Sequence, residues 1–212
     1  RRMVTKYYVL RTPCYRQMYI SGFRRIDTTT FPGEYLSVVE LSSGDGHGVS
    51  ETEVANTVHG DRDSIDAVMF TCRDGDVLGL DGIHRTIRNI RPPLMDTVLR
   101  TPGTVPAALD DLIGAGYADH VLFVFDRKLT RSQTESVAIA TSGDCRFSAE
   151  IMMDPSLVDT ATLEDIAETL RGARSITLRR VESPESCRPY RKSDLTSMAK
   201  SLKGMAKEVR LA

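Results

Sequence analysis

From Phe31 to Val54 the sequence reads Phe-Pro-Gly-Glu-Tyr-Leu-Ser-Val-Val-Glu-Leu-Ser-Ser-Gly-Asp-Gly-His-Gly-Val-Ser-Glu-Thr-Glu-Val. The apolar run at 35–41 is rich in β-branched residues and predicts a buried strand. Glycines follow it, and Ser50-x-x-Glu53 is then a capping box, which is typical of a helix N-terminus. Parallel strand–helix proteins place their chemistry at the carboxyl ends of strands, so functional groups are expected first in the loop at 42–48.

The alternation of strand and helix continues to the end of the chain. Strand starts recur about every 30 residues, the length of one strand–helix crossover unit. Apolar stripes with a helical period lie between them, with the weakest helical pattern at 131–142. Pro106, the capping box Thr130-x-x-Gln133, Thr162 and Ser193 are the predicted helix starts. The predicted strands are 35–41, 67–71, 94–99, 121–125, 147–153 and 176–181, with a short last strand at 209–211.

Six such units fit either an open, doubly wound sheet or an incomplete barrel, and periodicity leaves both open. Ahead of them, residues 5–10 and 17–20 are β-prone and predict an N-terminal hairpin or a pair of edge strands. A polar connector at 24–30 is expected to lead into the first core strand. We therefore expect an N-terminal β extension at 1–20 and a single α/β domain at 21–212.

Composition excludes several classes of protein. Of 212 residues, 41% are apolar and 27% charged, and the net charge is −1, which argues against disorder and against a nucleic-acid partner. No apolar run reaches the roughly 18–20 residues of a membrane span, so no membrane partner is expected. The cysteines Cys14, Cys72, Cys145 and Cys187 are widely spaced, which is typical of reduced thiols. The sequence thus predicts a cytoplasmic protein.

A phosphate cradle and a metal site are two possible interpretations of the residues that follow the strands. Gly44-x-Gly46-x-Gly48 opens a helix, but it matches neither known glycine-rich spacing and contains Asp45 and no lysine, so a polar turn is the better interpretation. A metal site is the second interpretation, although no ligand pair has a known local spacing. The candidate metal ligands are Asp45, His47, Cys72 and Asp74, with Asp126 as a further carboxylate.

Nucleophilic catalysis is the third interpretation. Cys72 ends a predicted strand, His47 lies on the neighbouring loop, and Arg73 could lower the pKa of the thiol. The candidate catalytic residues are therefore Cys72, His47 and Asp74. The sequence alone gives no geometry for this arrangement.

Several segments resemble the radical S-adenosylmethionine (SAM) activating proteins of anaerobic ribonucleotide reductase and related glycyl-radical enzymes. The likeness begins with Met18-Tyr-Ile-Ser-Gly-Phe and Phe31-Pro-Gly-Glu-Tyr-Leu-Ser-Val-Val, and continues through Asp66-Ala-Val-Met-Phe-Thr. Thr101-Pro-Gly stands where the family has Thr-Asn-Gly, and Asp126-Arg-Lys is similar to its Asp-x-Lys. The resemblance implies an incomplete (βα)6 TIM-like barrel of the radical SAM type. It also makes Thr101, Gly103, Asp126 and Lys128 weak candidates for cofactor binding.

The chain departs from this family where the family's chemistry resides. The family's C-x-x-x-C-x-x-C loop binds a four-iron cluster, whereas residues 42–48 contain no cysteine. Its Gly-Gly-Glu, which binds the SAM amino group, corresponds to Cys72-Arg-Asp-Gly, and its fifth-strand arginine falls near Ser148 or Ala149. The comparison therefore implies no standard iron–sulfur cluster, makes SAM binding doubtful, and leaves no cofactor expected.

These departures predict a cluster-less relative that lacks radical SAM catalysis and acts as a binding, regulatory or assembly protein. Its partner would be another protein at the open side of the barrel, or a second copy of the chain. One alternative is a repurposed metal- or thiol-dependent enzyme that uses the strand-end pocket. Another is an unusual radical SAM activase with non-standard iron ligands, Cys72 and Cys187, completed by a partner.

Overall fold

The computed structural model describes residues 20–26, 38–43, 51–73, 75–91, 95–181 and 188–212, with side chains from residue 51 onward. Its described part is an α/β structure built on a single sheet of eight strands, in the order β1-β2-β3-β4-β5-β6-β7-β8. The predicted N-terminal strands at 5–10 and 17–20 lie outside the described residues, apart from Ile20. The same holds for residues 44–50, which contain most of the predicted loop at 42–48.

Seven of the strands run parallel, each beside the next in the sequence. β1 (Ile20–Ile26) is antiparallel to β2 (Val38–Ser43), and every later neighbouring pair is parallel. The other strands are β3 (Ala67–Cys72), β4 (Asp96–Thr101), β5 (His120–Phe125), β6 (Arg146–Met153), β7 (Ser175–Arg180) and β8 (Glu208–Leu211).

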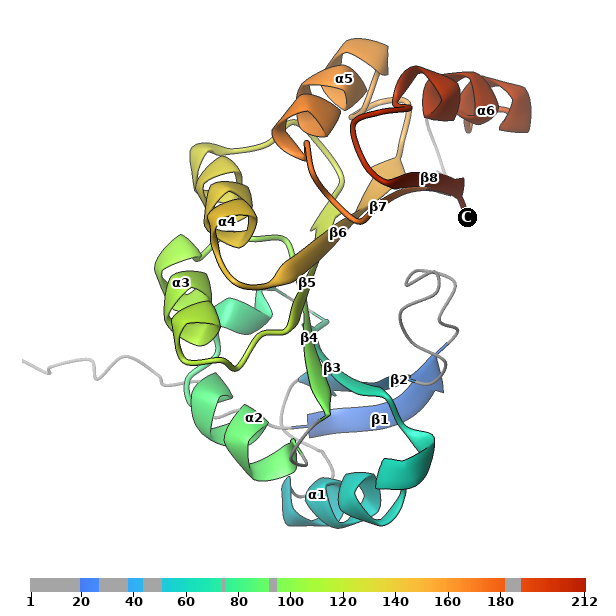
Figure 1. Cartoon of the computed structure of the whole chain (residues 1–212). Coiled ribbons are helices and arrows are strands. Elements are labelled where there is room, and N and C mark those ends of the chain that lie inside the picture. Colours follow the sequence, from blue (N-terminus) through green and yellow to red (C-terminus); the bar gives the residue numbers. More distant parts are fainter. Residues whose placement is uncertain (1–19, 27–37, 44–50, 74, 92–94, 182–187) are drawn as a thin grey trace, which may run out of the picture.

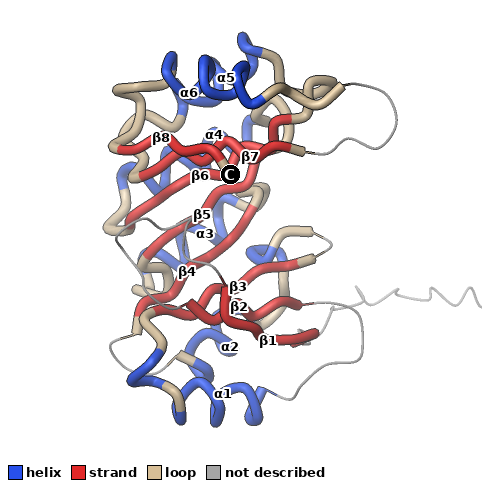
Figure 2. The backbone as a smooth tube through the Cα atoms, turned by 90° about the vertical axis from the view of Figure 1, so that its right-hand side faces the viewer, coloured by secondary structure: helices blue, strands red, loops and turns tan. Residues whose placement is uncertain are grey.

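The helices cover the outer, convex face of a curved sheet, and its two edge strands lie apart on the open side (Figure 1). Figure 2 shows the strands side by side from β1 to β8. A doubly wound sheet would reverse its strand order, so the sequential order leaves the barrel-like alternative, in an open form. The helices are α1 (Glu51–Gly60), α2 (Ile83–Ile90), α3 (Pro106–Gly114), α4 (Arg131–Ser142), α5 (Thr160–Thr169) and α6 (Lys192–Ser201), with short 3-10 turns η2 (Arg62–Ser64) and η3 (Val77–Gly79).

Alternation along the strands divides the sheet into two faces. The outward residues join the helices in one large core; in β6 these are Phe147, Ala149, Ile151 and Met153. On β3 to β8, whose side chains the structure describes, the inward face holds a small buried apolar cluster of Ala67, Met69, Val98 and Leu122. Buried polar residues occupy further inward positions on these strands, among them Thr71, His120, Ser148, Glu150, Ser175 and Thr177. Over β3 to β8, the concave face is therefore more polar than the face that packs against the helices.

Most predicted elements are confirmed, including the weakly patterned helix at 131–142 and the last strand. The connector at 24–30 is wrong in its first half, because β1 extends to Ile26 and pairs with β2. The first core strand runs through Ser43, so the loop after it begins later than predicted.

Two of the predicted helix caps are also wrong. Asp159 caps α5, where its carboxylate accepts a hydrogen bond from the Thr162 backbone N–H, and Arg191 precedes α6 in place of Ser193. A carboxylate at a helix start accepts a hydrogen bond from a backbone N–H that has no partner within the helix. Its negative charge also interacts favourably with the positive end of the helix dipole. Among the helices that the structure describes, none combines the length and apolar character needed to cross a bilayer.

Candidate functional site

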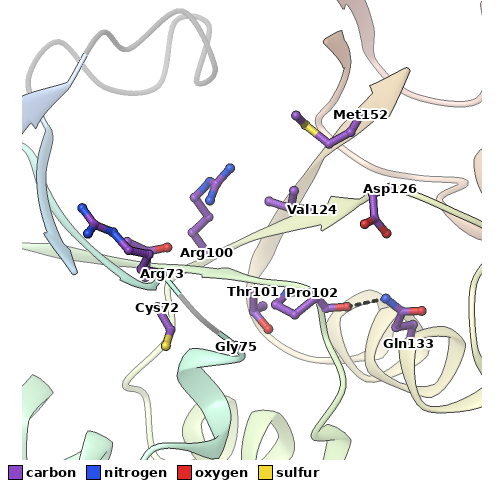
Figure 3. A pocket seen from close by; sticks show the side chains of 11 residues that line it. Cys72, Arg73, Gly75, Arg100, Thr101, Pro102, Val124, Asp126, Gln133 and Met152 are labelled. Atoms are coloured by element: carbon purple, nitrogen blue, oxygen red, sulfur yellow. Dashed lines mark hydrogen bonds between the residues drawn. The ribbon is translucent and has the colours of Figure 1, made fainter. Parts of the chain in front are cut away.

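A depression of about 350 Å³ lies at the carboxyl ends of β3, β4, β5 and β6 (Figure 3). Arg100 extends from β4 between Arg73 on one side and Val124 and Met152 on the other, while the Cys72 sulfur points the opposite way. We call this depression the strand-end pocket. Its lining residues are Thr71, Cys72, Arg73, Gly75, Arg100, Thr101, Pro102, Val124, Asp126, Gln133 and Met152.

Asp76 holds together the two loops that form one wall of the pocket. Its Oδ1 accepts hydrogen bonds from the Leu78 backbone N–H (3.0 Å) and the Thr101 hydroxyl (2.6 Å). Its Oδ2 accepts from the backbone N–H (2.7 Å) and hydroxyl (2.8 Å) of Thr104. The Thr101 oxygen in turn accepts from the Gly103 N–H at 2.8 Å. Thr101 and Gly103, both weak cofactor candidates, therefore serve the structure of this loop.

Asp76→Ala is expected to lower the free energy of unfolding by about 2 kcal/mol, because it removes the acceptor of four hydrogen bonds and hydrogen bonds to charged groups are the stronger ones. Urea denaturation followed by circular dichroism measures the change. The matched control is Asp110→Ala on the exposed surface of α3, which should leave the free energy nearly unchanged. Equal effects of the two substitutions would contradict the bridging role of Asp76.

The first turn of α4 fixes the other side of the same loop. Thr130 and Gln133 form the predicted capping box, in which the Gln133 side chain accepts from the Thr130 N–H. The Gln133 amide then donates to the Pro102 carbonyl (3.0 Å), and the Ser136 hydroxyl donates to the Gly103 carbonyl (2.8 Å). The helix start and the loop after β4 are thus joined by two hydrogen bonds.

A buried carboxylate organises the concave face beside the pocket. Glu150 is 2% exposed, and its Oε2 accepts a hydrogen bond from Arg100 at 3.0 Å. Its Oε1 accepts two from Arg179, on β7, at 3.1 and 2.5 Å. The arginine side chains are 32% and 40% exposed. Glu150 therefore fixes two guanidinium groups whose outer parts reach solvent.

Asp126 and Lys128, the other two weak cofactor candidates, have separate partners. Arg127 donates to both oxygens of Asp126, at 2.8 and 2.9 Å, and this pair holds the pKa of the Asp126 carboxyl below its usual value. The ammonium group of Lys128 lies 3.7 Å from a carboxylate oxygen of Asp165, and both side chains are largely exposed. Asp126 borders the pocket with its charge balanced by Arg127, whereas Lys128 is not among the lining residues.

The two cysteines that the structure describes lie at opposite ends of strands. Cys72 ends β3 at the pocket, but its half-buried side chain packs against the large core. Cys145 precedes β6, and burial raises the pKa of its thiol to about 11, with Asp119 and Asp144 adding to the effect. A thiol with this pKa stays protonated near neutral pH. Because only the thiolate is a good nucleophile, Cys145 is poorly suited to nucleophilic catalysis.

Asp45, His47, Asp74 and Cys187, the other candidate metal, catalytic or iron-binding residues, lie outside the described residues. Within the described ranges, no group of three or more His, Cys, Asp or Glu side chains is arranged to bind a metal ion.

Sequence reasoning did not single out Asp76, Glu150 or Arg179. Glu150 had a usable signal, because a charged residue within the apolar run Phe-Ser-Ala-Glu-Ile-Met-Met must be paired if it is buried. Nothing in the sequence linked Asp76 to Thr101 and Thr104, because these two partners lie 25 and 28 residues further along the chain.

No protein-family model and no curated protein matches this sequence.

Proposed function

We propose that this chain is a binding protein for a small anionic molecule, which it takes up in the strand-end pocket. One observation carries this proposal: the charged side chains that line the pocket are Arg73, Arg100 and Asp126, and Asp126 is already balanced by Arg127. Arg100 shares the Glu150 carboxylate with Arg179, so Arg73, Arg100 and Arg179 together leave two positive charges available to a ligand in and beside the pocket. Guanidinium groups bind carboxylate and phosphate through paired, charge-assisted hydrogen bonds.

The side chains around the pocket also favour binding over catalysis. Cys72 packs against the core, and the Thr101 hydroxyl both donates to Asp76 and accepts from the Gly103 N–H. A catalytic nucleophile needs a base within hydrogen-bond reach, and these two groups have structural partners instead. The pocket thus offers recognition groups on loops that are held together by hydrogen bonds.

We further propose that the chain is a cluster-less relative of the radical SAM activating proteins that does not carry out radical SAM chemistry. The open, sequentially ordered sheet with its helices on one face is compatible with the barrel that the resemblance implies. Such a protein would act in regulation or assembly, and the open side would leave the concave face accessible to a partner.

The anion-binding proposal is tested by calorimetric titration of the protein with phosphate, sulfate and citrate. We expect binding that Arg100→Gln and Arg73→Gln each weaken at least fivefold, because each removes a positive charge and its donors from the lining. The control is Arg88→Gln on the exposed surface of α2, outside the pocket, which should leave binding unchanged. Failure of every anion to bind the wild-type protein would contradict the proposal.

Anaerobic reconstitution with iron and sulfide tests the cluster-less assignment separately. The protein should remain colourless, with no stoichiometric iron after desalting. A brown protein with a full complement of bound iron would contradict this assignment and favour the unusual activase.

A further inference from the structure

The geometry points to a more specific ligand for the strand-end pocket: we infer that it binds a phosphate monoester, whose phosphoryl group sits on Arg100 and Arg179 above Glu150. This inference rests on the proposed anion-binding function and extends the site to a residue beyond the pocket lining. The Arg100–Glu150–Arg179 group joins β4, β6 and β7 across the concave face.

The register of the sheet places Arg179 next to the pocket. Met152 lines the pocket and is the direct partner of Arg179 on the neighbouring parallel strand. Side chains of such partners lie on the same face, and neighbouring strands are about 4.8 Å apart. Val124, another lining residue, is likewise the partner of Glu150. The arginine group and the pocket are therefore one continuous surface.

Both guanidinium groups keep donors for a ligand. Arg100 donates to Glu150 through Nη2 alone, and Arg179 through Nε and Nη2, so the Nη1 groups of both have no hydrogen bond to any described residue. Because Glu150 fixes the position of each arginine, less side-chain freedom is lost when a ligand binds. Two guanidinium groups held in place by one carboxylate form a preorganised binding site for an oxyanion.

A second observation comes from Thr177 on β7. Its side chain lies on the concave face, where it is the register partner of Glu150, and it is 2% exposed. Its hydroxyl has no hydrogen-bond partner among the described residues. A buried hydroxyl without a partner costs free energy, so Thr177 adds an unmet hydrogen-bonding group next to the arginine group.

The charge of the site matches a phosphate monoester. Arg73, Arg100 and Arg179 contribute three positive charges, Glu150 one negative charge, and Asp126 is neutralised by Arg127. The described side chains thus leave two positive charges uncompensated. A phosphate monoester carries about −1.5 to −2 near neutral pH and offers three acceptor oxygens to the guanidinium donors.

Calorimetric titration with inorganic phosphate, methyl phosphate and succinate tests the inference on the wild-type protein and on Arg179→Gln. We expect methyl phosphate and phosphate to bind at least tenfold more tightly than succinate, and Arg179→Gln to weaken both about tenfold. The matched control is Arg180→Gln, which removes the same charge from the adjacent, exposed position of β7 and should change binding less than twofold. Succinate binding as tight as phosphate binding would overturn the choice of a phosphoryl group.

The outcomes separate this inference from the proposed function. If Arg100→Gln and Arg73→Gln weaken anion binding but Arg179→Gln does not, the pocket binds anions, and the inference that Arg179 binds the phosphoryl group is wrong. If no anion binds the wild-type protein, both proposals fail. Arg179→Lys keeps the charge without the fork and serves as a second test should Arg179→Gln not fold. It is expected to weaken phosphate binding severalfold, and wild-type affinity would overturn the inference that Arg179 binds the phosphoryl group.

Discussion

Glu150→Ala is expected to destabilise the protein by about 3–5 kcal/mol, because it leaves two arginines without the carboxylate that pairs with them. Glu150 is 2% exposed and is the shared acceptor for Arg100 and Arg179. Without it, two guanidinium groups face each other on the concave side with no described carboxylate between them. Urea unfolding should show the loss as a decrease of roughly 1–2 M in the midpoint.

Glu168→Ala is the control, because it breaks a glutamate–arginine pair on the surface. Glu168 and Arg171 lie one helical turn apart at the end of α5, with side chains 61% and 60% exposed. Exposed pairs of this kind contribute little to stability, since water and salt screen them. If Glu150→Ala changes the midpoint no more than Glu168→Ala does, Glu150 does not organise the concave face.

Gly103→Ala is expected to destabilise the protein by about 2–4 kcal/mol, the second large effect. Gly103 has a φ of +72°, where an alanine is strained, and a Cβ there would lie 3.0 Å from Phe123 Cε1 and 3.2 Å from Ser136 Cβ. The backbone strain costs about 1–2 kcal/mol, and the overpacking costs about 1–3 kcal/mol. Phe123 cannot move aside easily, because it stacks on Phe125 at 5.6 Å between ring centroids.

Gly116→Ala isolates the packing part of that effect. Gly116 has nearly the same backbone conformation, with a φ of +70°, but a Cβ there would meet nothing within 4 Å. It should therefore cost only the backbone strain, about 1–2 kcal/mol. Equal losses at the two glycines would show that contact with Phe123 contributes nothing. Because Gly103 adjoins Pro102 in the pocket wall, Gly103→Ala should also weaken anion binding, whereas Gly116→Ala should not.

Some local structure could be predicted well from the sequence, because neighbouring residues decide it. Thr130 and Gln133 form their capping box through hydrogen bonds within one helical turn, so four consecutive residues are enough to predict the start of α4. Asp159 also acts within one turn, but the choice between it and Thr162 as the cap depends on where the backbone turns into the helix. Local patterns locate an element more reliably than its first residue.

The side chains of the candidate site, in contrast, are positioned by the tertiary structure and not by neighbouring residues. Cys72 and Thr71 are adjacent in the sequence and both line the pocket, yet alternation turns the Cys72 side chain toward the helices and that of Thr71 toward the concave face. A shift of the strand by one residue would exchange the two. Residue type at a strand end therefore predicts proximity to a pocket but not which side chain points into it.

The sequence by itself determined the repeating strand–helix units, the apolar faces and the helix starts at Pro106 and Thr130, because periodicity and capping act over a few residues. Only the tertiary structure decided that the strands follow one another in order around an open sheet, that Asp76 joins two loops, and that Glu150 holds Arg100 and Arg179. These contacts join residues 25 to 50 positions apart. Their partners are chosen by strand register and burial, which no local pattern contains.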